Sequence, residues 1–180
     1  MNYGYLLVKF AHLLGAAGFF AAYASEWVGV EGLRRASDAE QARRAISVCN
    51  RVQWVGLPSL LLLLGAGIYL TTTAWSWEAG WIGLSIGALV LMAVLGGTIN
   101  GRKIAALQKA LPASGPLDAS WRARVGDPLL SLSLRLRIAL TVGILFLMTM
   151  KLVEHWKGLV VIAVALVAGA LASLPAWRRL

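Results

Sequence analysis

Lys9 and His12 are the ionisable side chains that stand in the first apolar stretch of the sequence, LVKFAHLLGAAGFF. Ionisable groups within a membrane-spanning segment are costly, and they therefore point to function. The long stem of Lys9 lets its ammonium group reach the outer headgroups, which predicts a membrane-interface residue. His12 cannot reach so far, and a neutral imidazole can donate a hydrogen bond, ligate a metal or haem iron, or relay protons. We therefore take His12 as the candidate cofactor-binding residue.

Haem b and copper are the two groups that we consider for His12. The other histidine, His155, is expected at or beyond the outer surface. His12 is expected about 12 Å below the outer end of its helix, so the two imidazoles are poorly placed for one iron. Copper(I) prefers soft ligands, but Met148 and Met150 point to nearly opposite sides of a helix. No cofactor is predicted, and haem b or copper at His12 stays the alternative.

Catalytic patterns are missing from the rest of the sequence. It has no Ser-His-Asp set, no paired catalytic carboxylates and no zinc-ligand spacing. Glu26 and Glu31 are expected near the inner end of the first span, and no carboxylate is expected at the membrane midplane, which weakens a proton-driven carrier. The single cysteine, Cys49, suits a small packing residue. We therefore expect a protein that is not an enzyme.

The composition indicates the elements that must position these residues. Hydrophobic residues make up 59% of the 180 residues and charged residues 14%, whereas about a quarter of a soluble domain is charged. Five apolar runs approach the length of about 20 residues that crosses a bilayer. They are residues 4–24, 52–70, 81–100, 136–152 and 158–177. We expect an all-α polytopic membrane bundle of about five transmembrane helices that forms a single domain over residues 1–180.

Two helix beginnings can be predicted between these runs. Ser37 followed by Glu40 has the spacing of a capping box, and the helix after it is expected to continue into the second span, with a kink at Pro58. Asp127-Pro128 has the order of an N-cap followed by a first-turn proline. The alternating LSLSLRLR that follows is interpreted as helix, because an isolated strand edge cannot exist in lipid. Whether the fourth span begins before Arg135 stays open.

Basic residues predict the orientation of the chain. Lys and Arg accumulate in short cytoplasmic loops. Fourteen of the 17 lie between the first and second spans, between the third and fourth, or at the end of the chain in Arg178 and Arg179. We expect the amino terminus outside and the carboxyl terminus in the cytoplasm, in a bacterial inner membrane. The net charge of +9 indicates attraction to anionic inner-leaflet lipids rather than to nucleic acid.

Two further sets of residues are expected to place the helices. Tryptophan prefers the headgroup level, so the predicted membrane-interface residues are Lys9, Trp54, Trp75, Trp77, Trp81 and Trp156. Small residues at helical spacing let two backbones approach closely, so the predicted helix-packing residues are Ala11, Gly15, Gly18, Ala22, Gly83 and Gly87. Such surfaces also favour a homo-oligomer or a larger membrane complex.

Four segments together resemble a known family: KFAHLLGAA, GLPSLLLLLGAGIYLTTTAWSW, VLGGTINGRKIAAL and FLMTMKL. They are similar to a family of small bacterial integral-membrane proteins, domain-of-unknown-function family 2269, and more loosely to copper-resistance-D-like membrane domains. The resemblance covers about residues 3–152, and it implies that Lys9 and His12 match a lysine-histidine pair in the family's first span. Here Met150-Lys151 is followed by Leu152 rather than by proline, and a fifth span continues. The resemblance implies no activity.

The sequence thus predicts a noncatalytic integral membrane protein, either a transporter-like bundle or an accessory subunit of a membrane complex. The alternative is a haem- or copper-binding membrane protein for redox chemistry or metal handling that uses His12.

Overall fold

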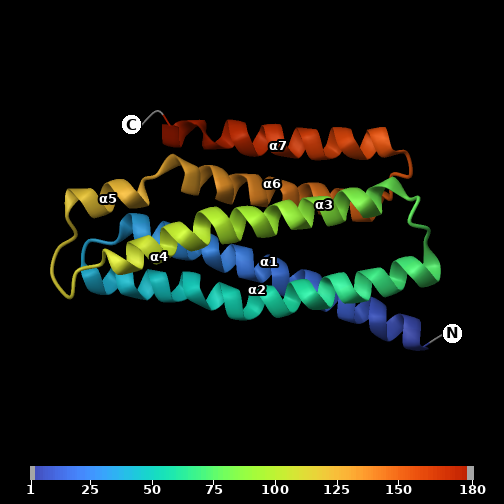
Figure 1. Cartoon of the computed structure of the whole chain (residues 1–180), viewed down its shortest axis with the longest axis horizontal. Coiled ribbons are helices and arrows are strands. Elements are labelled where there is room, and N and C mark those ends of the chain that lie inside the picture. The colour runs from blue at the N-terminus through green and yellow to red at the C-terminus, as the bar shows by residue number, and fades with distance from the viewer. Residues whose placement is uncertain (1–2, 178–180) are drawn as a thin grey trace.

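Helices joined by short connections make up the computed structural model, which describes residues 3–177 (Figure 1). They are α1 (Tyr3–Arg35), α2 (Ala39–Ala74), α3 (Gly80–Leu95), the π-helix η1 (Gly96–Gly101), α4 (Arg102–Lys109), α5 (Ala119–Val125), α6 (Pro128–Met150) and α7 (His155–Trp177). Within these residues there is no strand beyond an isolated bridge between Asp38 and Pro116. Five helical segments are long and apolar enough to cross a membrane, which confirms the predicted all-α bundle. Arg178 and Arg179 lie outside the described residues.

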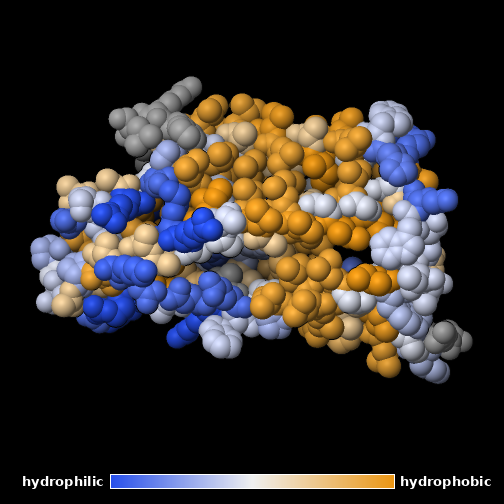
Figure 2. Space-filling view, in the orientation of Figure 1, coloured by the Kyte–Doolittle hydropathy of each residue, from blue (hydrophilic) through white to orange (hydrophobic). Residues whose placement is uncertain are grey.

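The chain passes along the bundle five times, so its two ends lie at opposite ends of the molecule (Figure 1). We call one end the basic end: it holds the α1–α2 connection, α4 and α5. Its cations include Arg34, Arg35, Arg43, Arg44, Lys109, Arg122 and Arg124. Figure 2 shows hydrophilic side chains gathered over this end and an apolar band across the middle of the bundle. The cations that predict the orientation therefore lie together in space.

The first two helices are longer than the apolar runs within them. α1 has 33 residues and α2 has 36, which at 1.5 Å per residue is about 50 Å, whereas a hydrocarbon core is about 30 Å thick. The predicted spans ended at residue 24 and began at residue 52. The parts beyond them stay helical because they bury an apolar core of their own at the basic end. That core includes Val30, Leu33, Ala42, Ile46, Ile104, Leu107, Trp121 and Leu130.

Side-chain caps begin the helices at the basic end. Asp38 accepts from the backbone amide of Gln41 at 2.9 Å, so the N-cap of α2 lies one residue after the predicted Ser37. The backbone amide of Ser37 donates to Gln41 Oε1 at 3.3 Å, so Gln41 takes the accepting role predicted for Glu40. Asp127 caps α6 and Pro128 is its first residue, as predicted. The fourth long helix therefore begins before Arg135.

The connection between α4 and α5 packs against the connection between α1 and α2. The amide of Ala39 donates to the carbonyl of Gly115 at 3.0 Å, and that of Leu117 donates to Ser37 at 3.5 Å. Gly115 has a φ of +94°, a conformation that residues with a Cβ rarely adopt. This pairing joins two segments far apart in the sequence and closes the basic end of the bundle.

The predicted small-residue stripe of α1 packs closely against α2. A Cβ at Gly15 would lie 2.7 Å from the backbone nitrogen of Leu63, and one at Gly18 would collide with the hydroxyl of Ser59. Ala22 is buried and Ala11 is half-buried. These two backbones can approach because the glycines carry no side chain.

The predicted stripe of α3 is different. Where a Cβ would stand at Gly83 or Gly87, no described atom lies within 4 Å, and both glycines are exposed. The close packing predicted at these two positions is therefore not made within residues 3–177, because α3 turns this face away from the other helices.

Most of the predicted membrane-interface side chains are exposed. They are Lys9, Trp54, Trp75, Trp77 and Trp156. Trp81 differs, because only 6% of it is exposed. Its ring meets Trp75 edge to face at 5.3 Å between centroids, and the α6–α7 connection covers the first turn of α3, where the amide of Gly80 donates to Val153. Trp81 is thus a core residue at the end opposite the basic end.

Candidate functional site

A buried ion pair joins the first long helix to the fourth. Glu26 of α1 accepts a hydrogen bond from Nη2 of Arg137 of α6 at 2.5 Å, across 111 residues of sequence. The two side chains are 6% and 3% exposed, respectively. Asn100 of η1 donates from Nδ2 to the other carboxylate oxygen of Glu26 at 2.6 Å. Three segments of the bundle therefore meet at one carboxylate.

Helical spacing explains why these charged residues point inward. The buried residues of α1 recur every three or four positions, and Glu26 lies four residues after Ala22 on that stripe. Arg137 occupies the equivalent place on α6, between the buried residues Leu134 and Leu140. A helix that buries its apolar stripe must also bury whatever residue falls on it.

The guanidinium group of Arg137 has two further neighbours. It lies over the ring of Tyr23, 4.5 Å from the centroid, in a cation–π contact. Its Nη1 lies against Gly96, where any Cβ would collide with it. η1 thus supplies both the glycine that makes room for Arg137 and the amide of Asn100. π-helical turns are rare and occur frequently at functional sites.

Two polar atoms of this group have no hydrogen-bond partner among the described residues. They are Nε of Arg137 and Oδ1 of Asn100, and both are buried. One is a donor and the other is an acceptor. Buried polar atoms are nearly always paired in native proteins. Each of these two atoms therefore keeps the capacity for one further hydrogen bond.

A cavity of about 390 Å³ borders the ion pair. It lies between α1, α2, α6 and the segment from α3 to α4. Its polar lining residues are Tyr23, Glu26, Cys49, Asn50, Gln53, Gln108 and Arg137. At about 30 Å³ per liquid water, the cavity has space for roughly a dozen water molecules or for one small solute.

The charges that line this cavity cancel. Among the described residues, Glu26 and Arg137 are the only acidic and basic ones that line it, and each neutralises the other across 2.5 Å. Removing both ions from water costs several kcal/mol per ion, so a buried pair is weak evidence for a purely stabilising role. The arrangement can hold a polar molecule, and it offers hydrogen bonds without a net charge.

His12, the predicted cofactor-binding residue, is not part of this group. It lies 14 positions before Glu26 on α1, or about 21 Å along the helix. Its Nδ1 donates to the backbone carbonyl of Leu63 at 3.0 Å, and its ring packs on Gly67. A structural hydrogen bond between α1 and α2 thus explains how the imidazole is accommodated. Cofactor binding at His12 stays a prediction.

The other candidate metal ligands lie apart from one another. His155 is exposed at the first turn of α7. Within residues 3–177, no three His, Cys, Asp or Glu side chains lie close enough to hold a metal ion. A haem iron or a copper ion held by His12 needs no such cluster, so haem b or copper at His12 stays the alternative.

Sequence reasoning missed Glu26, Asn100 and Arg137 as a group. It placed Glu26 near the inner end of the first span and did not link it to Arg137, whereas both side chains are buried and paired. The available signal was the predicted packing stripe of α1, because one more step of four residues beyond Ala22 reaches Glu26.

The fold and the site define a class of protein: an all-helical bundle with helices of membrane-spanning length and a buried ion pair beside a polar-lined cavity. Comparisons with protein-family models, with curated proteins and with solved structures give no match for the chain. The resemblance to domain-of-unknown-function family 2269 and to copper-resistance-D-like domains therefore stays a prediction.

Proposed function

We propose that this chain is a noncatalytic integral membrane protein, a transporter-like bundle that binds a small polar solute in the cavity beside Glu26 and Arg137. The observation that carries the proposal is the buried pair itself, which lines a cavity of about 390 Å³. An ion pair of this kind contributes little net stability compared with apolar side chains of the same size. Its position beside unpaired hydrogen-bonding atoms favours a role in binding.

The same proposal includes the location and orientation of the protein. The basic end faces the cytoplasm and meets anionic lipids of a bacterial inner membrane, with the amino terminus on the outer side. The clustering of cations at one end of the bundle supports this orientation (Figure 2), because Lys and Arg are retained on the cytoplasmic side. The proposal also includes a homo-oligomer or a larger membrane complex, in which the chain serves as an accessory subunit.

Solute binding can be tested by thermal unfolding of the purified protein in lipid nanodiscs. The probes are sodium chloride, inorganic phosphate, acetate, glycine, urea and glycerol. A solute at 100 times its dissociation constant stabilises the folded state by about 2.7 kcal/mol. We expect at least one probe to raise the midpoint in a saturable manner, and this rise to vanish in the double variant Glu26→Leu/Arg137→Met.

The matched control is Glu31→Gln, because Glu31 forms ion pairs nearer the surface and is not a lining residue of the cavity. This variant should respond to the probe as the native protein does. Binding at the ion pair would be refuted if no probe raised the midpoint, or if the double variant responded equally.

An absorption spectrum with metal analysis separates this proposal from the alternative at His12. The proposal expects neither a Soret band nor stoichiometric copper in the purified protein. A Soret band or stoichiometric copper that is lost in His12→Ala would instead support a haem- or copper-binding protein. The functional site would then be at His12 and not at Glu26.

A further inference from the structure

We propose that a second pocket at the basic end is the entrance to the cavity beside Glu26 and Arg137. On this view, a hydrogen bond between Asn50 and Gln108 separates the two spaces, and the path admits a small uncharged solute with hydrogen-bond donors and acceptors. This inference rests on the proposed function, because it names the route and the chemical class of the solute for the same site.

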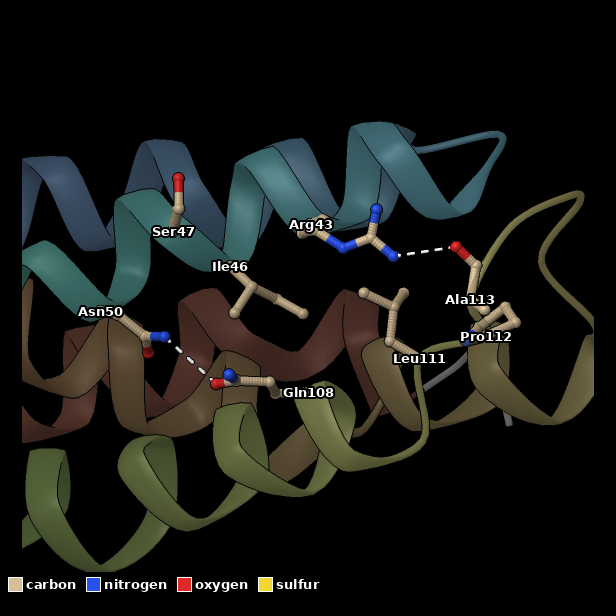
Figure 3. Close-up of a pocket in the computed structure, with 8 residues that line it drawn as sticks. All are labelled: Arg43, Ile46, Ser47, Asn50, Gln108, Leu111, Pro112 and Ala113. Carbon is tan, nitrogen blue, oxygen red and sulfur yellow. Dashed lines mark hydrogen bonds between the residues drawn. The ribbon is translucent and has the colours of Figure 1, made fainter.

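The second pocket, which we call the end pocket, has a volume of about 360 Å³. It is lined by Arg43, Ile46, Ser47, Asn50, Gln108, Leu111, Pro112 and Ala113 (Figure 3). Two hydrogen bonds stand at its two ends in this view. At one end Asn50 Nδ2 donates to Gln108 Oε1 at 3.2 Å, and at the other Arg43 Nη2 donates to the carbonyl of Ala113 at 3.0 Å.

Asn50 and Gln108 belong to both spaces. They are the two residues that line the end pocket and also line the cavity beside the ion pair. One comes from α2 and the other from α4. The hydrogen bond between them therefore lies at the boundary between the two spaces, where it joins the helices that form both walls.

The lining residues of α2 follow one face of the helix from one space to the other. Arg43, Ser47 and Asn50 line the end pocket, and Asn50, Gln53 and Leu57 line the cavity beyond it. Successive members are three or four residues apart, which keeps them on one face. The end pocket and the cavity therefore follow one another along the interface between α2 and α4.

The hydrogen bond between Asn50 and Gln108 can be broken at a low cost in free energy. Asn50 and Gln108 are uncharged, their side chains are exposed, and one hydrogen bond of 3.2 Å holds them together. Such a neutral bond contributes little net free energy in the presence of water. Side-chain rotation is enough to separate the amides, and no helix has to move.

Charge balance indicates the class of solute. Within the cavity, the carboxylate of Glu26 is matched by the guanidinium of Arg137, and the other polar lining groups are uncharged amides, a thiol and a phenol. An ion that enters finds no unpaired counter-charge, and burying it is costly. An uncharged amide-like or polyol-like molecule instead finds the side-chain amides of Asn50, Gln53 and Gln108 along the route.

Cys49 is a built-in reporter for this route. It is the single cysteine of the chain, and it lines the cavity but not the end pocket. The experiment measures how fast Cys49 of the full chain in lipid nanodiscs reacts with three methanethiosulfonates that carry a methyl, an ethylammonium or an ethylsulfonate group. Each rate is divided by the rate of the same reagent with a free small thiol, which removes differences in intrinsic reactivity.

We expect the uncharged reagent to react about tenfold faster than either charged reagent, because only the charged ones must lose hydration without a counter-charge. Gln108→Ala should raise the rate of the uncharged reagent by about two- to tenfold, the factor that the loss of one neutral hydrogen bond allows. Asn50→Ala should do the same, and it serves as the second variant if the first does not fold. Glu31→Gln, which lines neither space, should leave the rate unchanged. Cys49→Ser should abolish labelling.

Equal rates in the native protein and both amide variants would overturn the route, since the reagent would then reach Cys49 by another way. Faster labelling by a charged reagent would overturn the proposed class of solute. Neither result touches binding itself, because the thermal unfolding of Glu26→Leu/Arg137→Met tests the site without reference to the route.

Discussion

Arg137 donates to Glu26, lies over Tyr23 and leaves its Nε without a partner among the described residues. These contacts compensate for the loss of water around the guanidinium only while both ions are present. A single substitution leaves one buried charge uncompensated, whereas a double apolar substitution removes both costs. The ion pair thus lends itself to a comparison of single and double variants.

We predict that Arg137→Met alone lowers the free energy of unfolding by about 3–5 kcal/mol, because Glu26 then stays buried without a cation. The double variant Glu26→Leu/Arg137→Met should lie within about 1 kcal/mol of the native protein or above it. Denaturant titration of the purified protein in detergent measures both. A double variant as unstable as the single one would show that the pair is needed for folding rather than for binding.

The N-cap residue of α2, Asp38, should make the thermal stability of the protein depend on pH. The amide hydrogen bond from Gln41 holds the pKa of Asp38 below its ordinary value of 3.8. A carboxyl group with a lowered pKa contributes stability that is present above the ordinary value and is lost as the pH falls through the lowered one. We predict that Asp38→Ala lowers the thermal midpoint at pH 6, and that the difference from the native protein shrinks between pH 4 and pH 2.5. A pH-independent difference would contradict this origin.

Local chemistry explains which single residues were predictable. Asp127-Pro128 was recognisable because a cap and its proline are adjacent in the sequence. Glu26 and Arg137 are 111 residues apart, and no local pattern links them. Periodicity can show that each lies on a buried face, but only the packing of α1 against α6 shows that the two faces meet.

At the scale of the elements, small residues let α1 and α2 pack closely. Gly15 and Gly18 were predictable from their spacing, and their neighbours on α2 are Leu63 and Ser59. The length of the two helices was not predictable from apolar runs, because the last turns of α1 and the first turns of α2 bury residues against α4 and α5 and not within an apolar run of spanning length. The π-helical turn at η1 also has no recognised signal in its sequence, GGTING.

We predict opposite results for alanine at two glycines. Gly15→Ala should lower the thermal midpoint, because its Cβ would lie 2.7 Å from the backbone nitrogen of Leu63 and the helices would have to separate. Gly83→Ala meets no described atom within 4 Å, so it should leave the midpoint unchanged or raise stability by up to about 1 kcal/mol through helix propensity. Thermal unfolding in one detergent compares the two. Equal destabilisation would mean that Gly83 packs against a second molecule, which light scattering would then detect.

At the scale of the whole molecule, an apolar band separates the basic end from a smaller polar surface at the opposite end (Figure 2). Apolar run lengths were sufficient to predict five long helices, because crossing a bilayer requires a minimum length of apolar sequence. They could not predict that the bundle continues beyond the band, since that part resembles a soluble helical domain with its own core. The cavity could not be predicted from the sequence either, because residues of four separate segments line it together.

Reporter fusions test the orientation of the bundle. We predict that a phosphatase active only outside the cytoplasm is active when fused after Ser76, in the α2–α3 connection. The same enzyme should be inactive after Ser114, near the basic end, because the cations there hold this end in the cytoplasm. A fluorescent protein at the carboxyl terminus should fluoresce. The reverse pattern at both fusion sites would place the basic end outside.

The separation of Glu26 from Arg137 also imposes an order of events during synthesis. At about 5–20 residues per second, a ribosome needs roughly 6–20 s to add the 111 residues between them. Helices form in about a microsecond, so α1 and α2 can pair at Gly15 long before α6 exists. Throughout this interval the nascent hairpin carries a carboxyl group whose cation has not yet been made. The machinery that inserts the chain therefore meets Glu26 as a lone acid, and the completed ion pair is a late event in the life of each molecule.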